Sequence, residues 1–163
     1  MRLLLALVVV GALSCAAAAA RPAGTAPVTC TSIITPAGSY EWRPKRVVLG
    51  LVAAPPRYIP QTVRGEGRWP YWSKAGLVVR ADSPPVVVRV PPAWWDRVAI
   101  TWGDGGPAAA LRIDSCPPSS SLGPWNPYSG SFLLKTRSAC VPLTFRAGEQ
   151  SATVRFGVGK RCA

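Results

Sequence analysis

The sequence predicts an all-β fold, specifically an antiparallel β-sandwich of about seven to eight short strands stabilised by disulfides. Three observations support this prediction. Short apolar runs rich in valine recur about every ten residues, Pro-Pro and Asp-Gly pairs separate them, and four of the five cysteines follow the apolar N-terminal segment. No convincing amphipathic helix is present, and the only candidate for a helical turn is residues 93–97. This pattern favours a sandwich over alternating strand and helix units.

The clearest local signal is a hairpin near the C-terminus. Apolar residues at Val141, Leu143 and Phe145 alternate with polar ones, and residues 152–158 repeat the pattern. A period of two indicates strands with one buried face and one solvated face. Residues 147–150 connect the two runs and include a glycine that can adopt positive φ, so we expect a four-residue or bulged hairpin loop there.

The remaining strands are expected in short apolar runs. They lie at residues 28–34, 46–53, 77–80, 86–90, 98–102, 109–113 and 132–136. Residues 57–74 are rich in Pro, Arg, Gly and aromatic residues without a clear period, and we expect a long exposed loop. A loop of that length in a compact domain either has a function or indicates a wrong assignment.

The N-terminal segment has the layout of a secretory signal peptide. A positive residue, an apolar run and small residues follow one another within residues 1–20. We therefore expect a signal peptide at 1–20, a flexible leader at 21–27 and a single domain at 28–163, with no transmembrane segment after removal of the signal. The alternative is a lipoprotein signal, in which Cys15 carries the lipid.

The cysteines predict two disulfides. If Cys15 is removed with the signal, Cys30, Cys116, Cys140 and Cys162 remain, which is an even number in an exported chain. Of the three pairings, we favour Cys116 with Cys140 and Cys30 with Cys162. A zinc site is not expected because the chain has neither a histidine nor a C-x-x-C motif.

The chain is strongly basic, with 19 Lys and Arg against seven Asp and Glu. Acidic partners are therefore expected: anionic cell-wall polymers, an anionic lipid surface or acidic polysaccharide. Nucleic acid is not expected, because the positive charges are scattered and never form a block of five or six. High-GC coding is an alternative explanation for the arginine content. We expect a monomer that is secreted and stays close to the cell envelope.

No catalytic, cofactor-binding or metal-binding residue is predicted. The absence of histidine excludes serine and cysteine nucleophiles activated by imidazole. Asp104 lies in a glycine-rich stretch typical of a turn, and no other acid has the context of a glycosidase pair or a calcium site. Ser73 and Lys74 could form a dyad only if adjacent residues on a strand faced the same way, which they do not.

Aromatic residues in or beside loops are the one candidate ligand-binding set. They are Trp69, Tyr71, Trp72, Trp94 and Trp95, together with Trp125 and Tyr128. On one face they would form a platform for sugar rings, with Arg68 and Arg97 as donors. The alternative is that they close the open ends of the sandwich. The hypotheses are thus a non-enzymatic protein that associates weakly with the envelope, or a carbohydrate-binding module.

Four segments resemble a group of small secreted all-β proteins of actinobacteria. They are residues 94–100 (WWDRVAI), 130–132 (GSF), 140–143 (CVPL) and 156–162 (FGVGKRC), and the similarity covers residues 86–163. The resemblance implies an exported all-β domain and carries over no functional residue. The chain departs from the pattern at residues 130–131, where Gly-Ser replaces Gly-Gly.

Overall fold

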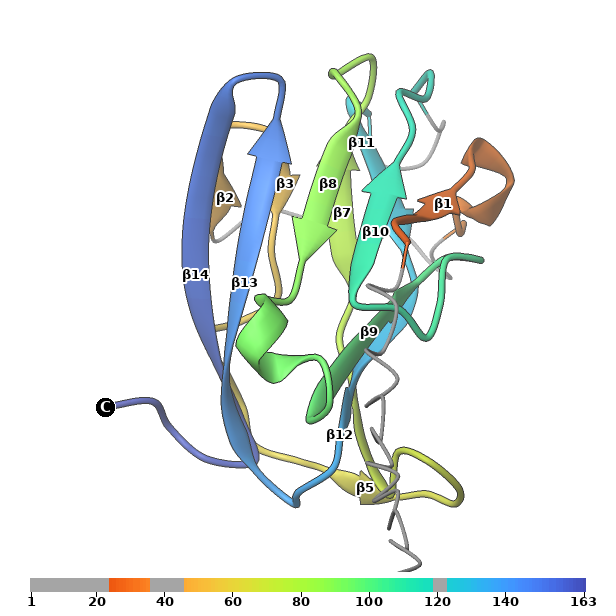
Figure 1. Cartoon of the computed structure of the whole chain (residues 1–163). Coiled ribbons are helices and arrows are strands. Elements are labelled where there is room, and N and C mark those ends of the chain that lie inside the picture. Colours follow the sequence, from red (N-terminus) through yellow and green to blue (C-terminus); the bar gives the residue numbers. More distant parts are fainter. Residues whose placement is uncertain (1–23, 36–45, 119–122) are drawn as a thin grey trace, which may run out of the picture.

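The computed structural model describes residues 24–35, 46–118 and 123–163 (Figure 1). Within these ranges the chain forms fourteen strands and two short 3₁₀ helices, so the predicted all-β class is confirmed with more strands than expected. No helix among the described residues is long and apolar enough to cross a membrane. The predicted signal peptide, including Cys15, lies outside the described residues.

The first layer is a six-stranded sheet. Its strands, in order across the sheet, are β1 (Ala26–Val28), β10 (Ala110–Ile113), β8 (Val86–Arg89), β13 (Ala139–Ala147), β14 (Gln150–Val158) and β4 (Tyr58–Ile59). The outermost pairs, β1 with β10 and β14 with β4, are parallel, and the pairs between them are antiparallel.

The second layer combines two four-stranded sheets. One has the order β11 (Trp125–Tyr128), β7 (Leu77–Arg80), β3 (Val52–Ala53), β2 (Val47–Val48), and the other β5 (Val63–Arg64), β6 (Tyr71–Lys74), β12 (Gly130–Leu134), β9 (Val98–Trp102). The chain passes from one sheet to the other twice, from β6 to β7 and from β11 to β12. At this junction the amide of Ala75 donates to the carbonyl of Gly130 (2.8 Å), so the two sheets act as one bent layer behind the first (Figure 1).

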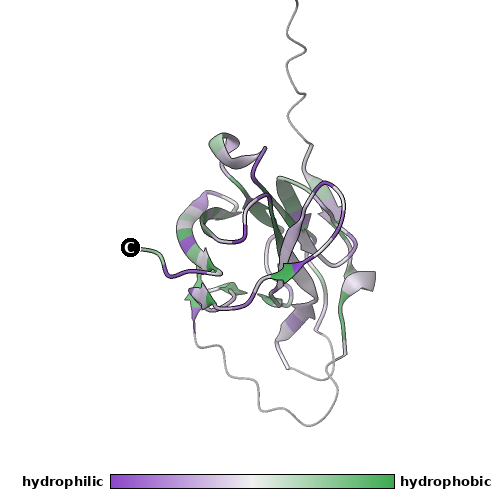
Figure 2. Ribbon diagram, turned by 90° about the horizontal axis from the view of Figure 1, so that it is seen from below, coloured by the Kyte–Doolittle hydropathy of each residue, from purple (hydrophilic) through white to green (hydrophobic). Residues whose placement is uncertain are grey.

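Aromatic side chains join the two layers in the core. Phe132 of the second layer lies 5.5 Å, centroid to centroid, from Phe156 of the first layer. Trp102 packs edge-on against Phe132, and its indole Nε1 donates to the carbonyl of Ala75 (2.9 Å), which satisfies the buried polar atom at the bend. Figure 2 shows hydrophilic and hydrophobic bands alternating along β14, as expected for a strand with one buried face.

The predicted C-terminal hairpin is confirmed and is longer than expected. β13 and β14 pair in continuous register from Ala139 opposite Val158 to Ala147 opposite Gln150. The connection is therefore a two-residue turn, and the prediction of a four-residue or bulged loop is wrong. Gly148 has φ 56° at the first central position, where hairpin turns of type II′ require glycine.

Two predicted segments differ from the structure. Residues 57–74, expected to be a long exposed loop, contain β4, β5 and β6, so that expectation is wrong. Residues 46–53, expected to be one strand, form the short β2–β3 hairpin, because Leu49 and Gly50 both adopt positive φ (55° and 67°) and reverse the chain. The helical turn expected near residue 93 is present as the 3₁₀ helix η2 (Pro92–Trp94).

The N-terminal part of the domain begins earlier than expected. β1 starts at Ala26, inside the segment predicted as a flexible leader, and pairs with β10. The strand expected at residues 28–34 is interrupted at once by the 3₁₀ helix η1 (Cys30–Ser32). Thus the ordered domain includes at least part of the predicted leader.

The structure forms two disulfides, but the favoured pairing is wrong. Cys30 bonds to Cys116, and Cys140 bonds to Cys162. The parallel pairing of β1 with β10 brings the segments that follow both strands together, which places Cys30 beside Cys116. Cys140 lies opposite Gly157 in the hairpin, and the chain folds back so closely that a Cβ on Gly157 would be 2.2 Å from the carbonyl oxygen of Lys160. Such bonds persist in oxidising compartments, as outside the cell.

Candidate functional site

Arginine side chains gather on the outer face of the six-stranded sheet. Strand register places Arg112 and Arg146 on either side of Val87, and the β13–β8 pairing places Thr144 opposite Arg89. Inward-facing residues of these strands are buried in the core, so these arginines point to solvent. Arg89, Arg112 and Arg146 line an open depression of about 550 Å³, which we call the outer-face hollow.

The three arginines of the outer-face hollow differ in how many of their N–H donors bond to other residues of the protein. Arg112 forms an ion pair with Asp114, and Arg146 donates from Nε to the carbonyl of Gly148 (3.0 Å). The guanidinium of Arg89 has no hydrogen bond or ion pair with any residue in the described ranges. A guanidinium carries five N–H donors, so most of the donors on this face are available to a bound anion.

A second group of arginines lies at one open edge of the sandwich. Arg46, Arg57, Arg155 and Arg161, which we call the edge arginine cluster, line a hollow of about 530 Å³ beside β14. None of these four residues lines the outer-face hollow. The sheet therefore carries two separate basic sites.

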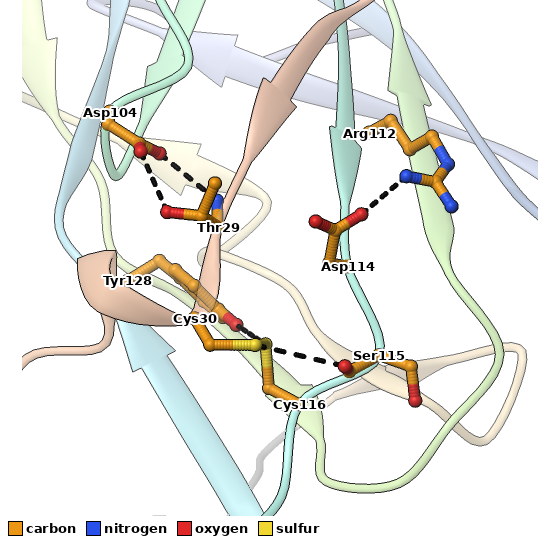
Figure 3. Close-up of polar contacts among 8 residues, drawn as sticks. All are labelled: Thr29, Cys30, Asp104, Arg112, Asp114, Ser115, Cys116 and Tyr128. Carbon is orange, nitrogen blue, oxygen red and sulfur yellow. Dashed lines mark hydrogen bonds and ion pairs between the residues drawn. A yellow bond between two sulfur atoms is a disulfide. The ribbon is translucent and has the colours of Figure 1, made fainter.

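The acidic residues that the structure describes do not gather into a metal-binding group. Asp104 accepts hydrogen bonds from the amide (3.2 Å) and hydroxyl (2.9 Å) of Thr29 (Figure 3). Its own amide donates to Ser32 Oγ. The side-chain hydrogen bonds from Ser32 and Thr29 lower the pKa of Asp104 to about 2. Asp104 thus fixes a turn, as predicted. In the described part of the chain, no three His, Cys, Asp or Glu residues could hold a metal ion.

Tyr128 is part of the core, although it was predicted to lie with the loop aromatics. Its hydroxyl donates to Cys116 Sγ (3.6 Å), beside the disulfide (Figure 3). Burial, followed by the charges of Asp114 and Asp104, raises the pKa of Tyr128 to about 12. Tyr128 is therefore a neutral structural residue at neutral pH.

Ser73 and Lys74 face opposite sides of β6, as expected for adjacent strand residues. Ser73 is buried, and its hydroxyl donates to the carbonyl of Gln61 (2.5 Å). Lys74 is exposed. The two side chains therefore cannot act as a dyad.

Two of the predicted ligand-binding aromatics meet in one hollow. Trp69 and Trp95 line a depression of about 530 Å³ together with Arg68 and Asp96, which we call the tryptophan hollow. The indole Nε1 of Trp95 donates to the carbonyl of Val90 (2.7 Å), which fixes the ring. Two cations, Arg68 and Lys135, lie 5.3 Å from the centroid of Trp69.

The other three predicted aromatics lie elsewhere. Tyr71 packs against the hydrophobic core. Trp72 follows it on β6 and contacts the segment at Gly65, where a Cβ would be 3.2 Å from the indole Cδ1. Trp94 lines a different depression, with the guanidinium of Arg97 4.5 Å from its ring centroid.

Sequence reasoning missed both arginine groups because their members are far apart in the chain. The charges look scattered in the sequence, and only the strand register and the fold-back of the C-terminal segment bring them together. The available local signal was that polar residues alternate with apolar ones in both runs, which places Thr144 with Arg146, and Thr153 with Arg155, on the outer face. In comparisons with known proteins, no family model matches the chain, and no curated protein and no solved structure is similar enough to count as a match.

Proposed function

We propose that this protein is a non-catalytic, exported β-sandwich that binds anionic polymers of the cell envelope through the outer-face hollow. The observation that carries this proposal is the convergence of Arg89, Arg112 and Arg146, from three neighbouring strands, on one solvent-facing depression. An open face with cations from three neighbouring strands suits an extended polyanion better than a small substrate.

The small number of acids near the outer-face hollow supports this proposal over the alternative that the arginines reflect only high-GC coding. Two acids, Asp114 and Glu149, lie near this face, and Asp114 is paired with Arg112. Each exposed contact contributes about 1 kcal/mol or less, so binding depends on several contacts along one polymer. Such contacts are screened over about 8 Å at physiological ionic strength.

The location outside the cell is supported by two features. The N-terminal segment has the composition of an export signal, and the domain holds two disulfides. The polyanions available there are wall polymers and acidic polysaccharides. We propose a monomer that is retained near the envelope by these polymers.

A salt titration tests this function. The purified protein is passed over immobilised uronic-acid polysaccharide and over an immobilised phosphodiester polymer at low ionic strength, then eluted with a salt gradient. Retention on both supports, followed by elution as the salt screens the charges, is expected. Flow-through on both supports, or retention that high salt leaves unchanged, would contradict the proposal.

A second candidate function is binding of neutral carbohydrate. The specific observation in its favour is that Trp69 and Trp95, both predicted from the sequence, line one hollow beside the donor Arg68. Indole rings stack on the apolar faces of sugars. The close cations around Trp69 weigh against this function because they compete for its ring.

A further inference from the structure

We propose that the edge arginine cluster is a preformed binding site for a single phosphate group. This inference uses Arg46, Arg57, Arg155 and Arg161, whereas polymer binding uses the outer-face hollow. The two proposals can therefore fail independently.

The four arginines come from three parts of the fold that meet at one edge of the sandwich. Arg46 immediately precedes β2 in the second layer. Arg57 precedes β4, and Arg155 and Arg161 lie on β14 and on the C-terminal segment after it. These four residues line one hollow of about 530 Å³. A ligand in it would thus contact both layers.

The backbone beside this hollow is also available to a ligand. β4 pairs with β14 only at Gly157 and Val158. Residues 153–155, which line the hollow, have no strand partner on that side among the described elements. An unpaired strand edge presents N–H groups that can donate to an anion.

Two of the four guanidinium groups are held in place before any ligand binds. The guanidinium of Arg161 lies 4.7 Å from the ring centroid of Tyr58, and that of Arg46 lies 5.9 Å from the ring centroid of Phe156. The amide of Gly157 donates to the carbonyl of Arg57 (2.7 Å). The Cys140–Cys162 disulfide fixes the segment that carries Arg161. Ordering the side chains of Arg46 and Arg161 on binding therefore costs little further entropy.

The cluster has donors and positive charge that nothing in the described structure satisfies. The Nη1 atom of Arg46 is buried and has no hydrogen-bond partner. No ion pair joins any of the four guanidinium groups to a carboxylate of a described residue. Burial, and secondarily repulsion from Arg57, lower the pKa of Arg46. A bound anion would relieve this repulsion.

Phosphate is the anion that this arrangement fits. A guanidinium presents parallel N–H donors that match two oxygens of one phosphate, and four such groups surround the hollow. A single carboxylate has two oxygens and one charge, so it would leave more of the donors unused. The phosphate group can be free, or it can belong to a wall polymer or a lipid headgroup.

Isothermal titration calorimetry with inorganic phosphate tests the site in the full exported chain. We expect saturable binding of one phosphate per chain, with acetate at the same concentration giving at least about tenfold weaker binding. The double variant Arg57→Gln/Arg161→Gln should raise the Kd at least about tenfold, and Arg57→Lys/Arg161→Lys should raise it less, since lysine keeps the charge but loses the paired donors. Both residues are exposed, so neither change should unfold the domain.

The matched control is Arg89→Gln/Arg146→Gln, which removes the same charge from the outer-face hollow and should leave the Kd for phosphate within about twofold. Absence of saturable phosphate binding, or equal weakening by the control, would overturn the proposal. A failure of polymer binding with intact phosphate binding would overturn only the proposed function.

Two further arms distinguish the sources of the phosphate group. Phosphatidylcholine vesicles with and without phosphatidic acid test a lipid headgroup, and a glycerol phosphate polymer tests a wall polymer. Both arms use the Arg89→Gln/Arg146→Gln protein, so that the outer-face hollow does not hold the polymer. Binding to either that inorganic phosphate displaces, and that the further change Arg57→Gln/Arg161→Gln abolishes, supports the site and identifies that source. Binding of inorganic phosphate without either supports a site for the free ion.

Discussion

Asp104, in the turn after β9, accepts two hydrogen bonds from Thr29, which lies 75 positions earlier in the chain. The next residue, Cys30, is bonded to Cys116. The disulfide attaches the segment after β1 to the segment after β10 in the six-stranded sheet, and Asp104 attaches it to the turn after β9 in the second layer (Figure 3). Three paired residues alone would hold such a strand weakly.

The carboxylate of Asp104 should make stability depend on acid pH. Its pKa is about 2 in the folded protein and about 3.9 in an unfolded chain. Its contribution is therefore fully present above the unfolded value and is lost as the pH falls through the folded value. We expect the free energy of unfolding, measured by urea denaturation, to fall between pH 4 and pH 2 in the native protein and to fall less in Asp104→Asn.

The control for this prediction is Glu66→Gln. Glu66 is exposed and has no hydrogen bond or ion pair with a described residue. Its variant should keep the pH dependence of the native protein. An identical pH dependence in Asp104→Asn and the native protein would show that Thr29 and Ser32 do not hold this carboxylate in its charged form.

The two disulfides should differ in their contribution to stability. Their half-cystines are 86 and 22 residues apart, and the loop-closure model gives roughly 4.6 and 3.4 kcal/mol for loops of those lengths. Cys30→Ala/Cys116→Ala should therefore be less stable than Cys140→Ala/Cys162→Ala in urea denaturation. Non-reducing peptide mapping should recover Cys30 with Cys116. Recovery of Cys30 with Cys162 would contradict the fold.

Gly130 should tolerate no side chain. A Cβ there would lie 1.9 Å from the carbonyl oxygen of Thr101, a backbone atom of the paired strand β9. Overpacking typically costs about 1 to 3 kcal/mol, and we expect Gly130→Ala to reach or exceed the upper value because a backbone atom cannot move aside. Gly76→Ala is the matched control, since its nearest neighbour is 4.0 Å away. Equal stabilities of the two variants would contradict the β9–β12 pairing.

The tryptophan hollow allows the carbohydrate hypothesis to be tested at named residues. If a neutral polysaccharide binds there, intrinsic tryptophan fluorescence should change on titration, and Trp69→Ala or Trp95→Ala should abolish the change. Trp72→Ala should not, because Trp72 does not line that hollow. A lack of response in the native protein to a panel of neutral glycans would end this hypothesis.

The sequence predicted the features that depend on neighbouring residues. The alternation at Val141, Leu143 and Phe145 placed the hairpin correctly because strand period is a local property. The two-residue turn was missed because Ala147 and Gln150 pair as strand residues although neither is a strong strand former. The strands in residues 57–74 were missed because they are two to four residues long.

The features that depend on distant residues could not be predicted. The pairing of Cys30 with Cys116 follows from the parallel contact of β1 with β10, which no local pattern encodes. The outer-face hollow depends on the register between β8, β10 and β13 in the same way. The prediction that Trp69 and Trp95 lie near a ligand site rested on residue type alone, and the fold placed these two together while separating them from Trp94.

Calorimetric titration of a phosphodiester polymer at low salt tests the central claim most directly, when Arg89→Gln/Arg146→Gln is compared with Arg64→Gln/Arg80→Gln. Both variants lose two charges, but Arg64 and Arg80 are exposed residues of the second layer. The account predicts that the first variant raises the Kd at least about tenfold and the second less than about threefold. Equal weakening by the two variants would show that net charge, and not the outer-face hollow, is responsible for binding.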